Sequence, residues 1–168
     1  FLLADGTIVH NTPEGQPVGI VLNLSLLTRI SDKIPTVLIR EIVENCDNII
    51  SINNFNDNIE YTKIFLNGIL LGISKEPYDL IDELKKLRNM KLIPWCVSIS
   101  YDDLDEEVHI CSDDGRLLRP VFNVENDKIL YTNEDGTNWD ELIDKNIISY
   151  IDNIEANNAV IAFNTNEL

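Results

Sequence analysis

The sequence is poor in basic residues, and this shortage limits what the chain can bind. Its 13 lysines and arginines stand against 29 aspartates and glutamates, so that the net charge is −16 and the pI is near 4.3. A surface with this charge repels the phosphates of nucleic acids. We therefore expect that the chain does not bind DNA or RNA unaided, and that any such contact is local or shared with a partner.

Cysteines and long apolar runs are also scarce. The three cysteines, Cys46, Cys96 and Cys111, are odd in number and form no C-x-x-C pair, which argues against a disulfide framework and against a zinc site. Such a chain is typical of a reducing, intracellular compartment. No apolar run reaches the roughly 18 residues of a membrane span, and the initial "FLL" is too short for a secretion signal. We expect no contact with a membrane.

Hydrophobic residues make up 44% of the 168 residues, which is enough for the core of one ordinary domain or two small ones. The amphipathic spacing after Pro35 predicts a helix that buries Ile39, Ile42, Val43 and Cys46. The pair Asn67-Gly68 between two apolar stretches indicates a tight β-hairpin. After Pro77 comes the strongest helical pattern, with an acidic first turn and a stripe formed by Leu80, Leu84 and Leu87.

The rest of the chain reads mainly as strands. Residues 95–101, 106–112 and 116–124 have strand character, with Pro120 indicating an edge or a bulge. A capping-box-like pattern predicts a helix in 138–146, and residues 147–152 and 159–163 are strand-like again. Without a regular alternation, this order indicates the α+β class, with mixed, mostly antiparallel sheets and a few packed helices in two small subdomains.

Three places offer groups that can bind metal ions, but each has a simpler explanation. The acidic run 102–107 supplies oxygen ligands for a hard cation, although a solvated turn is the interpretation that we favour. Residues 131–142 resemble a calcium loop but carry Tyr131 and Leu142 where carboxylates are needed. His109 has no second histidine or cysteine at ligand spacing. We expect no metal site and no cofactor within this chain.

Two arginines in "SDDGRLLRP" fall on opposite faces of an extended segment. Arg116 shares its face with apolar residues, so we expect it to need a carboxylate such as Asp113 or Asp114. A structural ion pair is favoured over a binding role for Arg116. Arg119 lies on the other face, from which it can reach a partner subunit. The two tryptophans, Trp95 and Trp139, are expected to pack in or at the rim of the core.

Four stretches occur in a telling order: "TPEGQPVGIVLNLSLLTRIS", "IFLNGILLGISKEPYDLIDELKKLRNMKLI", "VSISYDDLDEEVHICSDDGRLLRPVF" and "NWDELIDKNIISYIDNIEANNAVIAF". They contain the motifs T-P-E-G, N-G-x-x-x-G, D-G-R-x-x-R-P and Y-I-D. Each motif alone is common, but the four in this order are specific for one family. Together they resemble the middle of the second-largest subunit of multisubunit DNA-directed RNA polymerase, in its eukaryotic, archaeal and large-DNA-virus branch.

The resemblance implies three regions: the end of the fork region in 12–60, a first external domain in 61–125 and a second external domain in 126–168. It also implies a structural and assembly role in a nucleotidyltransferase that extends RNA from ribonucleoside triphosphates on a DNA template. The expected partners are the largest subunit, which carries the Mg²⁺ ligands of the assembled polymerase, and the other subunits. DNA template and RNA are expected to be bound only in the assembled enzyme, and the chain alone is expected to be inactive.

Within T-P-E-G, the resemblance places Glu14 at the position that faces the nucleotide-addition machinery. Pro13 restricts φ and Gly15 permits a sharp turn, so that Glu14 is presented on a rigid loop. A capping role for Glu14 at the start of a helix or loop is the alternative.

The leader "FLLADGTIVHN" does not continue the polymerase pattern upstream. It resembles the C-terminal splicing block of an intein, in which two strands around a glycine turn end in His-Asn before a hydroxyl residue. Asn11 can cyclise onto its own carbonyl, His10 can assist as a proton donor, and the Thr12 hydroxyl can accept the upstream segment. We therefore interpret 1–11 as an intein C-terminal segment. A diverged fork strand is the alternative.

A function of a different class also stays open: an acidic α+β protein-interaction module with no enzymatic role. For the polymerase subunit we expect the nucleus or the cytoplasm, or a virion or viral factory if the source is a virus.

Overall fold

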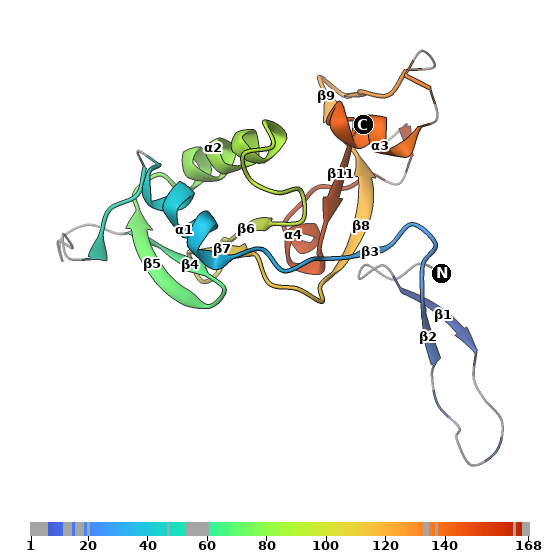
Figure 1. Cartoon of the computed structure of the whole chain (residues 1–168), viewed down its shortest axis with the longest axis horizontal. Helices are drawn as coiled ribbons and strands as arrows, with labels where there is room; N and C mark the ends of the chain where they lie inside the picture. Colours follow the sequence, from blue (N-terminus) through green and yellow to red (C-terminus); the bar gives the residue numbers. More distant parts are fainter. Residues whose placement is uncertain are drawn as a thin grey trace.

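The computed structural model describes residues 7–11, 15, 19, 21–46, 48–52, 61–132, 135–136, 138–162 and 164–165. In this part of the chain, helices and mostly antiparallel sheets follow one another without a regular repeat, which confirms the predicted α+β class. Figure 1 shows one group of elements around a four-stranded sheet and a second group around a three-stranded sheet, with a two-stranded hairpin projecting from them.

The four-stranded sheet has the order β5-β4-β7-β6. Its central strands β4 (Thr62–Leu66) and β7 (Glu107–Cys111) are parallel, whereas β5 (Ile69–Ser74) and β6 (Ser98–Asp102) join its edges in antiparallel fashion. The β4–β5 turn holds Asn67 at φ 49° and Gly68 at φ 78°, in the left-handed region that a tight hairpin turn requires. The predicted hairpin at Asn67-Gly68 is confirmed.

Both helices of the first group pack on this sheet. α1 (Thr36–Glu44) buries Ile39 and Val43, while α2 (Pro77–Asn89) has Pro77 in its first turn and buries Leu80, Ile81 and Leu84. These side chains form one core with the sheet residues Ile64, Leu66, Ile99, Val108 and Ile110. The two predicted helices are therefore confirmed, and their apolar stripes supply much of the larger core.

The three-stranded sheet has the antiparallel order β11-β8-β3. β8 (Leu117–Phe122) pairs with β11 (Ile148–Ile151) from Arg119 to Phe122 and with the short β3 (Arg29–Ile30) at Leu117 and Leu118. Pro120 therefore lies where β3 does not reach, so the residue has no neighbour on that side although β8 is the central strand. α3 (Trp139–Asp144) packs Leu142 against Ile147 and Ile148 of the same group.

The sequence expectation fails at the C-terminal end. Residues 159–162, which were expected to be a strand, lie outside any strand, and Val160 is fully exposed. A short helix precedes them instead, α4 (Asn153–Asn157), with Asp152 as its N-cap. Apolar residues alone predicted a strand here, but the exposed Val160 has no sheet to pack on.

Two small hairpins complete the described elements. β1 (Thr7–Asn11) pairs with β2 (Val21–Leu24), and β9 (Val124–Glu125) pairs with β10 (Lys128–Ile129). Across the described ranges, none of the helices has the length and apolar character that a membrane crossing needs.

Candidate functional site

The β1–β2 hairpin contains part of the predicted splice junction. β1 ends at Asn11, which is in register with Val21 of β2, and the pairing shifts between Val9 and Asn11. The strand predicted before the junction is therefore present in the backbone. Thr12 and Glu14 lie outside the described residues, so the splicing and active-centre roles of His10, Asn11, Thr12 and Glu14 stay predictions.

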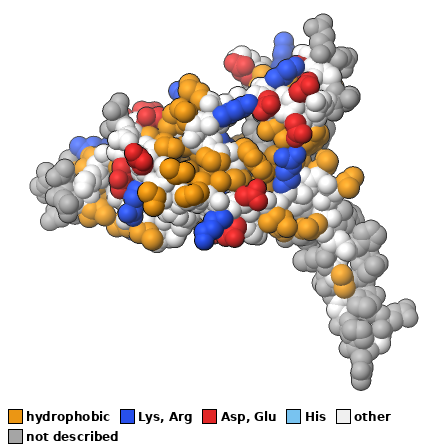
Figure 2. All heavy atoms as spheres, viewed as in Figure 1, with side chains coloured by type: hydrophobic (Ala, Val, Ile, Leu, Met, Phe, Trp, Pro, Cys, Tyr) orange, Lys and Arg blue, Asp and Glu red, His pale blue; other side chains and the backbone are white. Residues whose placement is uncertain are grey.

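Apolar side chains are exposed in two regions of the chain. After the hairpin, Leu26 is 97% exposed and its neighbours Leu24, Leu27 and Ile30 are about half exposed. Figure 2 shows a second gathering of hydrophobic side chains across the middle of the visible face, around α1 and the loop that follows α2, where Val37, Leu38 and Leu92 are exposed. Apolar surface of this extent is typical of a protein that contacts others.

Two largely buried ion pairs join the group around the four-stranded sheet to the group around the three-stranded sheet. Arg88 of α2 donates two hydrogen bonds to the carboxylate of Glu155 in α4, at 2.7 and 2.9 Å, and both side chains are at most 10% exposed. Arg88 also donates to the carbonyl oxygen of Val97. This bidentate geometry is the strong form of the arginine–carboxylate contact.

The second ion pair lies beside the first. Arg116 donates to Asp152 at 2.8 Å and to the carbonyl oxygen of Cys96 at 2.7 Å. Asp152 also accepts from the Ser98 hydroxyl and from the backbone N–H of Glu155, which caps α4. Each of these charges is paired with a charge of opposite sign. The cluster of Arg88, Ser98, Arg116, Asp152 and Glu155, here called the ion-pair junction, therefore fixes the two groups relative to each other.

The prediction for Arg116 is confirmed in part. Its Nε lies 3.1 Å from Asp113 Oδ1, which is one of the two carboxylates expected. The more buried partner is Asp152, whose side chain is 4% exposed, against 58% for Asp113. The buried carboxylate that pairs with Arg116 is therefore Asp152, which the sequence around Arg116 does not indicate.

An aromatic cluster connects β3 and the residues before it to α3 and β11. The guanidinium of Arg29 lies 5.1 Å from the ring centre of Tyr150 and 5.6 Å from that of Trp95. Trp139 donates to the Tyr150 hydroxyl, which donates in turn to the carbonyl oxygen of Leu27. Trp95 and Trp139 thus pack at the rim of the smaller cores, as expected.

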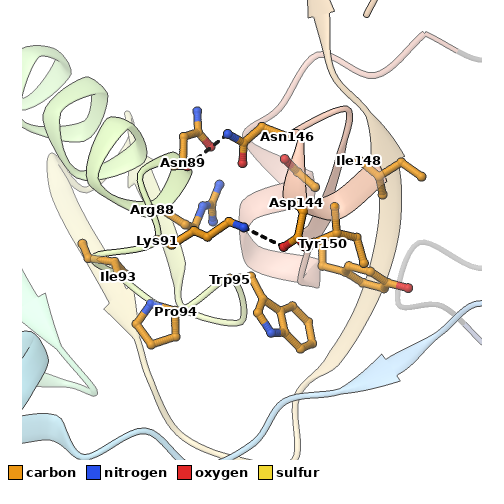
Figure 3. A pocket seen from close by; sticks show the side chains of 12 residues that line it. Arg88, Asn89, Lys91, Ile93, Pro94, Trp95, Asp144, Asn146, Ile148 and Tyr150 are labelled. Atoms are coloured by element: carbon orange, nitrogen blue, oxygen red, sulfur yellow. Dashed lines mark hydrogen bonds and ion pairs between the residues drawn. The ribbon is translucent and has the colours of Figure 1, made fainter. Parts of the chain in front are cut away.

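A pocket of about 250 Å³ opens between the loop after α2 and the α3–β11 segment. In Figure 3, Lys91 Nζ lies 2.6 Å from Asp144 Oδ1 across the pocket. The side-chain amide of Asn146 donates to the carbonyl oxygen of Asn89 at 3.0 Å. Its apolar part is formed by Ile93, Pro94, Trp95, Ile143, Ile148 and Tyr150. Its charged groups are all held in ion pairs, Lys91 with Asp144 and Arg88 with Glu155. The pocket therefore has the chemistry of a packing surface rather than of a catalytic centre.

Asp102 and His109, two titratable residues outside the ion-pair junction, contact residues close to them in the fold. Asp102 accepts hydrogen bonds from the backbone of Leu104 and Asp105, which builds the acidic turn that the sequence indicates. His109 stacks on Phe65 with ring centres 5.6 Å apart. Among the described residues, no group of three or more His, Cys, Asp or Glu side chains is placed to hold a metal ion.

Comparison with known proteins agrees with the sequence motifs. Residues 64–125 match the family model described as RNA polymerase Rpb2, domain 4. The chain is 36% identical over 163 residues to the DNA-directed RNA polymerase II subunit RPB2 of Encephalitozoon cuniculi. The alignment covers 92% of this chain and 14% of that protein. It is 31% identical to the DNA-directed RNA polymerase subunit Rpo2 of Sulfolobus acidocaldarius, with 94% of this chain and 16% of that subunit covered.

A viral relative gives the same result. The probable DNA-directed RNA polymerase II subunit RPB2 homolog of Invertebrate iridescent virus 6 is 30% identical over 94% of this chain. The chain is thus similar to second-largest RNA polymerase subunits over nearly all of its length. It spans only 14 to 16% of the length of these relatives. Within this segment, the matched range 64–125 contains Arg88 and Arg116, whereas Asp152 and Glu155 follow it. The ion-pair junction therefore joins the matched range to the part of the chain that follows.

The sequence interpretation missed both carboxylates of the ion-pair junction. A local signal was present, because Asp152 and Glu155 have the spacing of a capping box, with an acidic N-cap and a glutamate three residues later. That pattern predicts α4. It does not predict that both carboxylates turn toward arginines of other elements, which only their packing against α2 and β6 decides.

Proposed function

We propose that this chain is a structural and assembly segment of the second-largest subunit of a DNA-directed RNA polymerase, a nucleotidyltransferase that extends RNA on a DNA template. The observation that carries the proposal is the similarity to such subunits over 92 to 94% of the chain. We infer that 12–60 is the end of the fork region and that 61–125 and 126–168 are two external domains. The partners are the largest subunit and other subunits, and the compartment is intracellular.

The contacts within the chain support a structural role. The ion-pair junction and the aromatic cluster hold the two groups of elements in a fixed arrangement, and the exposed apolar residues around α1 and after β2 offer contact surface. An interaction module without enzymatic context would use the same surfaces, but similarity to polymerase subunits favours the first reading.

In this proposal the Mg²⁺ of the assembled polymerase is bound outside the chain. The described part has no cluster of three metal-binding side chains, and its net charge of −16 disfavours contact with phosphates without a basic partner. DNA and RNA are therefore held by other parts of the enzyme, and Glu14 is the residue that we propose to face the nucleotide-addition machinery.

Purification of the complete polypeptide that carries these residues tests the proposal. We expect a largest polymerase subunit to co-purify through an affinity tag, and we expect Mg²⁺-dependent RNA synthesis on a DNA template from the complex. The chain of 168 residues by itself should give no synthesis. Recovery of the complete polypeptide without any polymerase subunit, or RNA synthesis by the 168 residues alone, would contradict the proposal.

We further propose that residues 1–11 are the C-terminal segment of an intein. β1 ends at Asn11, the residue at which the cut is expected. The side-chain nitrogen of Asn11 attacks its own carbonyl carbon, which forms a succinimide and breaks the bond to Thr12. Before this step the Thr12 hydroxyl has accepted the upstream segment as an ester, which releases the Cys or Ser nucleophile that carried it. The freed amine of Thr12 then takes the segment from the hydroxyl as an amide, and the hydroxyl is restored.

Mass spectrometry of the precursor with its native upstream sequence tests the splicing proposal. The ligated product should continue downstream at Thr12. Asn11→Ala should block the release of the leader, and His10→Ala should slow it. A precursor that keeps 1–11 attached to Thr12, and in which Asn11→Ala changes nothing, would instead support a diverged fork strand.

A further inference from the structure

Arg119 differs from every other arginine of the described residues. The other arginines each have a carboxylate within 4.0 Å: Arg29 with Asp140, Arg40 with Glu44, Arg88 with Glu155 and Arg116 with Asp152. Arg119 forms no ion pair and no side-chain hydrogen bond with any described residue, and its Nε is buried without a partner. A chain with 29 acidic residues thus leaves one partly buried guanidinium unpaired.

An unpaired guanidinium in this position is costly. Arginine stays charged at any physiological pH, and a buried donor without an acceptor loses its hydration with no compensation. Buried polar groups almost always have a partner. The missing acceptor therefore has to come from outside the described residues. Because the Nε is enclosed by the chain itself, such an acceptor meets the terminal nitrogens of the guanidinium.

The surroundings of Arg119 define what can supply that acceptor. It projects on the same face of β8 as Leu117 and Val121, which are both partly buried. Leu117 is in register with Ile30 of β3, which is 53% exposed on the same face. The other face of β8 is closed by the core around Leu118 and Tyr150. Ile151 of β11, which is in register with Arg119 on this face, is only 5% exposed. The accessible part of the face therefore lies on its β3 side, where Leu117 and Ile30 flank the unpaired cation.

We propose that this face of β8 docks a polypeptide segment from outside residues 1–168, and that Arg119 binds a carboxylate of that segment. A carboxylate matches the planar guanidinium with two parallel hydrogen bonds, and the apolar neighbours suit a protein surface. A nucleic-acid phosphate is disfavoured by the net charge of −16. The relatives are long enough to supply such a segment, since this chain spans 14 to 16% of their length. This docking deepens the assembly role proposed above and rests on it.

Photo-crosslinking in the assembled enzyme tests the docking. The complete polypeptide carries p-benzoylphenylalanine in place of Ile30 and is purified with its partners. We expect a covalent product with a polypeptide segment that contains an aspartate or glutamate. Arg119→Met should lower the yield about tenfold or more, because one partner of a desolvated charge pair is lost. Arg40→Met, which removes an exposed arginine on α1, should leave the yield within about twofold.

A charge exchange identifies the carboxylate. Arg119→Glu should abolish the crosslink, and replacement of the acidic residue of the segment by arginine should restore it. If Arg119→Met does not fold, as judged by its melting temperature, Arg119→Lys decides instead: it keeps the charge but not the bidentate geometry, so its yield should fall to an intermediate value.

The outcomes separate this inference from the proposed function. A crosslink to DNA, RNA or a second copy of the chain, or equal yields for Arg119→Met and Arg40→Met, would overturn the docking while the polymerase assembly stands. Absence of any polymerase subunit from the purified sample would overturn both.

Discussion

Arg116 and Asp152 are 36 residues apart in sequence and 2.8 Å apart in space. The pair connects the residue directly before β8 to the N-cap of α4, and through Ser98 it reaches the four-stranded sheet. One carboxylate thus serves a helix cap, an ion pair and a contact between sheets. The stability of the whole arrangement should depend on it.

Asp152→Asn should lower the free energy of unfolding by up to about 3 to 5 kcal/mol, because Arg116 loses its buried carboxylate and keeps only the exposed Asp113 as a counter-charge. The matched control is Asp144→Asn, whose ion pair with Lys91 is exposed on both sides and should contribute about 0 to 1 kcal/mol. Urea unfolding followed by circular dichroism measures both. Equal losses for the two variants would show that the ion-pair junction contributes no more than a surface pair.

Gly72→Ala should destabilise the chain by about 1 to 3 kcal/mol. A Cβ at Gly72 would lie 3.0 Å from Ile49 Cγ2 and 3.0 Å from the carbonyl oxygen of Ile50, and the backbone oxygen cannot move aside alone. Gly68 is the control, because a Cβ there meets nothing within 4 Å and only its positive φ opposes alanine. A double-mutant cycle with Ile49→Ala should find coupling for Gly72 and none for Gly68.

The carboxyl group of Asp135 should titrate near pH 2 rather than at its ordinary value of 3.8. The Thr132 hydroxyl lowers the pKa most, followed by the Thr132 backbone N–H and Lys145, because all of them favour the charged form. With its pKa lowered in the folded state, Asp135 stabilises the fold above pH 3.8, and this contribution disappears as the pH falls toward 2. NMR titration of the side-chain carboxyl measures the value.

Thr132→Val provides the control for that titration. It removes the hydroxyl donor but keeps the shape of the side chain, so the pKa of Asp135 should rise toward 3.8. An unchanged pKa in Thr132→Val would mean that the hydroxyl does not hold the carboxylate.

Glu14→Ala should alter the elongation rate or fidelity of an assembled polymerase that lacks the leader, if Glu14 faces the nucleotide-addition machinery as proposed. The melting temperature of the chain should change little. The alternative role of Glu14 as a cap predicts the opposite, a stability loss of about 0.5 to 2 kcal/mol with normal elongation. Transcription assays and thermal unfolding on the same variant separate the two roles.

Several local features were predictable from the sequence. The Asn67-Gly68 hairpin and the helix after Pro77 form as expected because turn chemistry and apolar spacing act within a few residues. The family was also readable from the order of four motifs, which the comparisons support. The strand expected in 159–162 was wrong because apolar composition alone does not supply a neighbouring strand.

By itself, the sequence determined the helices α1, α2 and α3, the Asn67-Gly68 hairpin, the resemblance to the polymerase family and the need of Arg116 for a carboxylate. Each of these depends on residues near in the chain or on the order of motifs. Only the tertiary structure decided that Asp152 and Glu155 meet this need for Arg116 and Arg88, and that Arg119 is left unpaired. The reason is physical: a charge buried between packed sheets pairs with whichever carboxylate the packing brings within about 3 Å, and distance along the chain does not fix that choice.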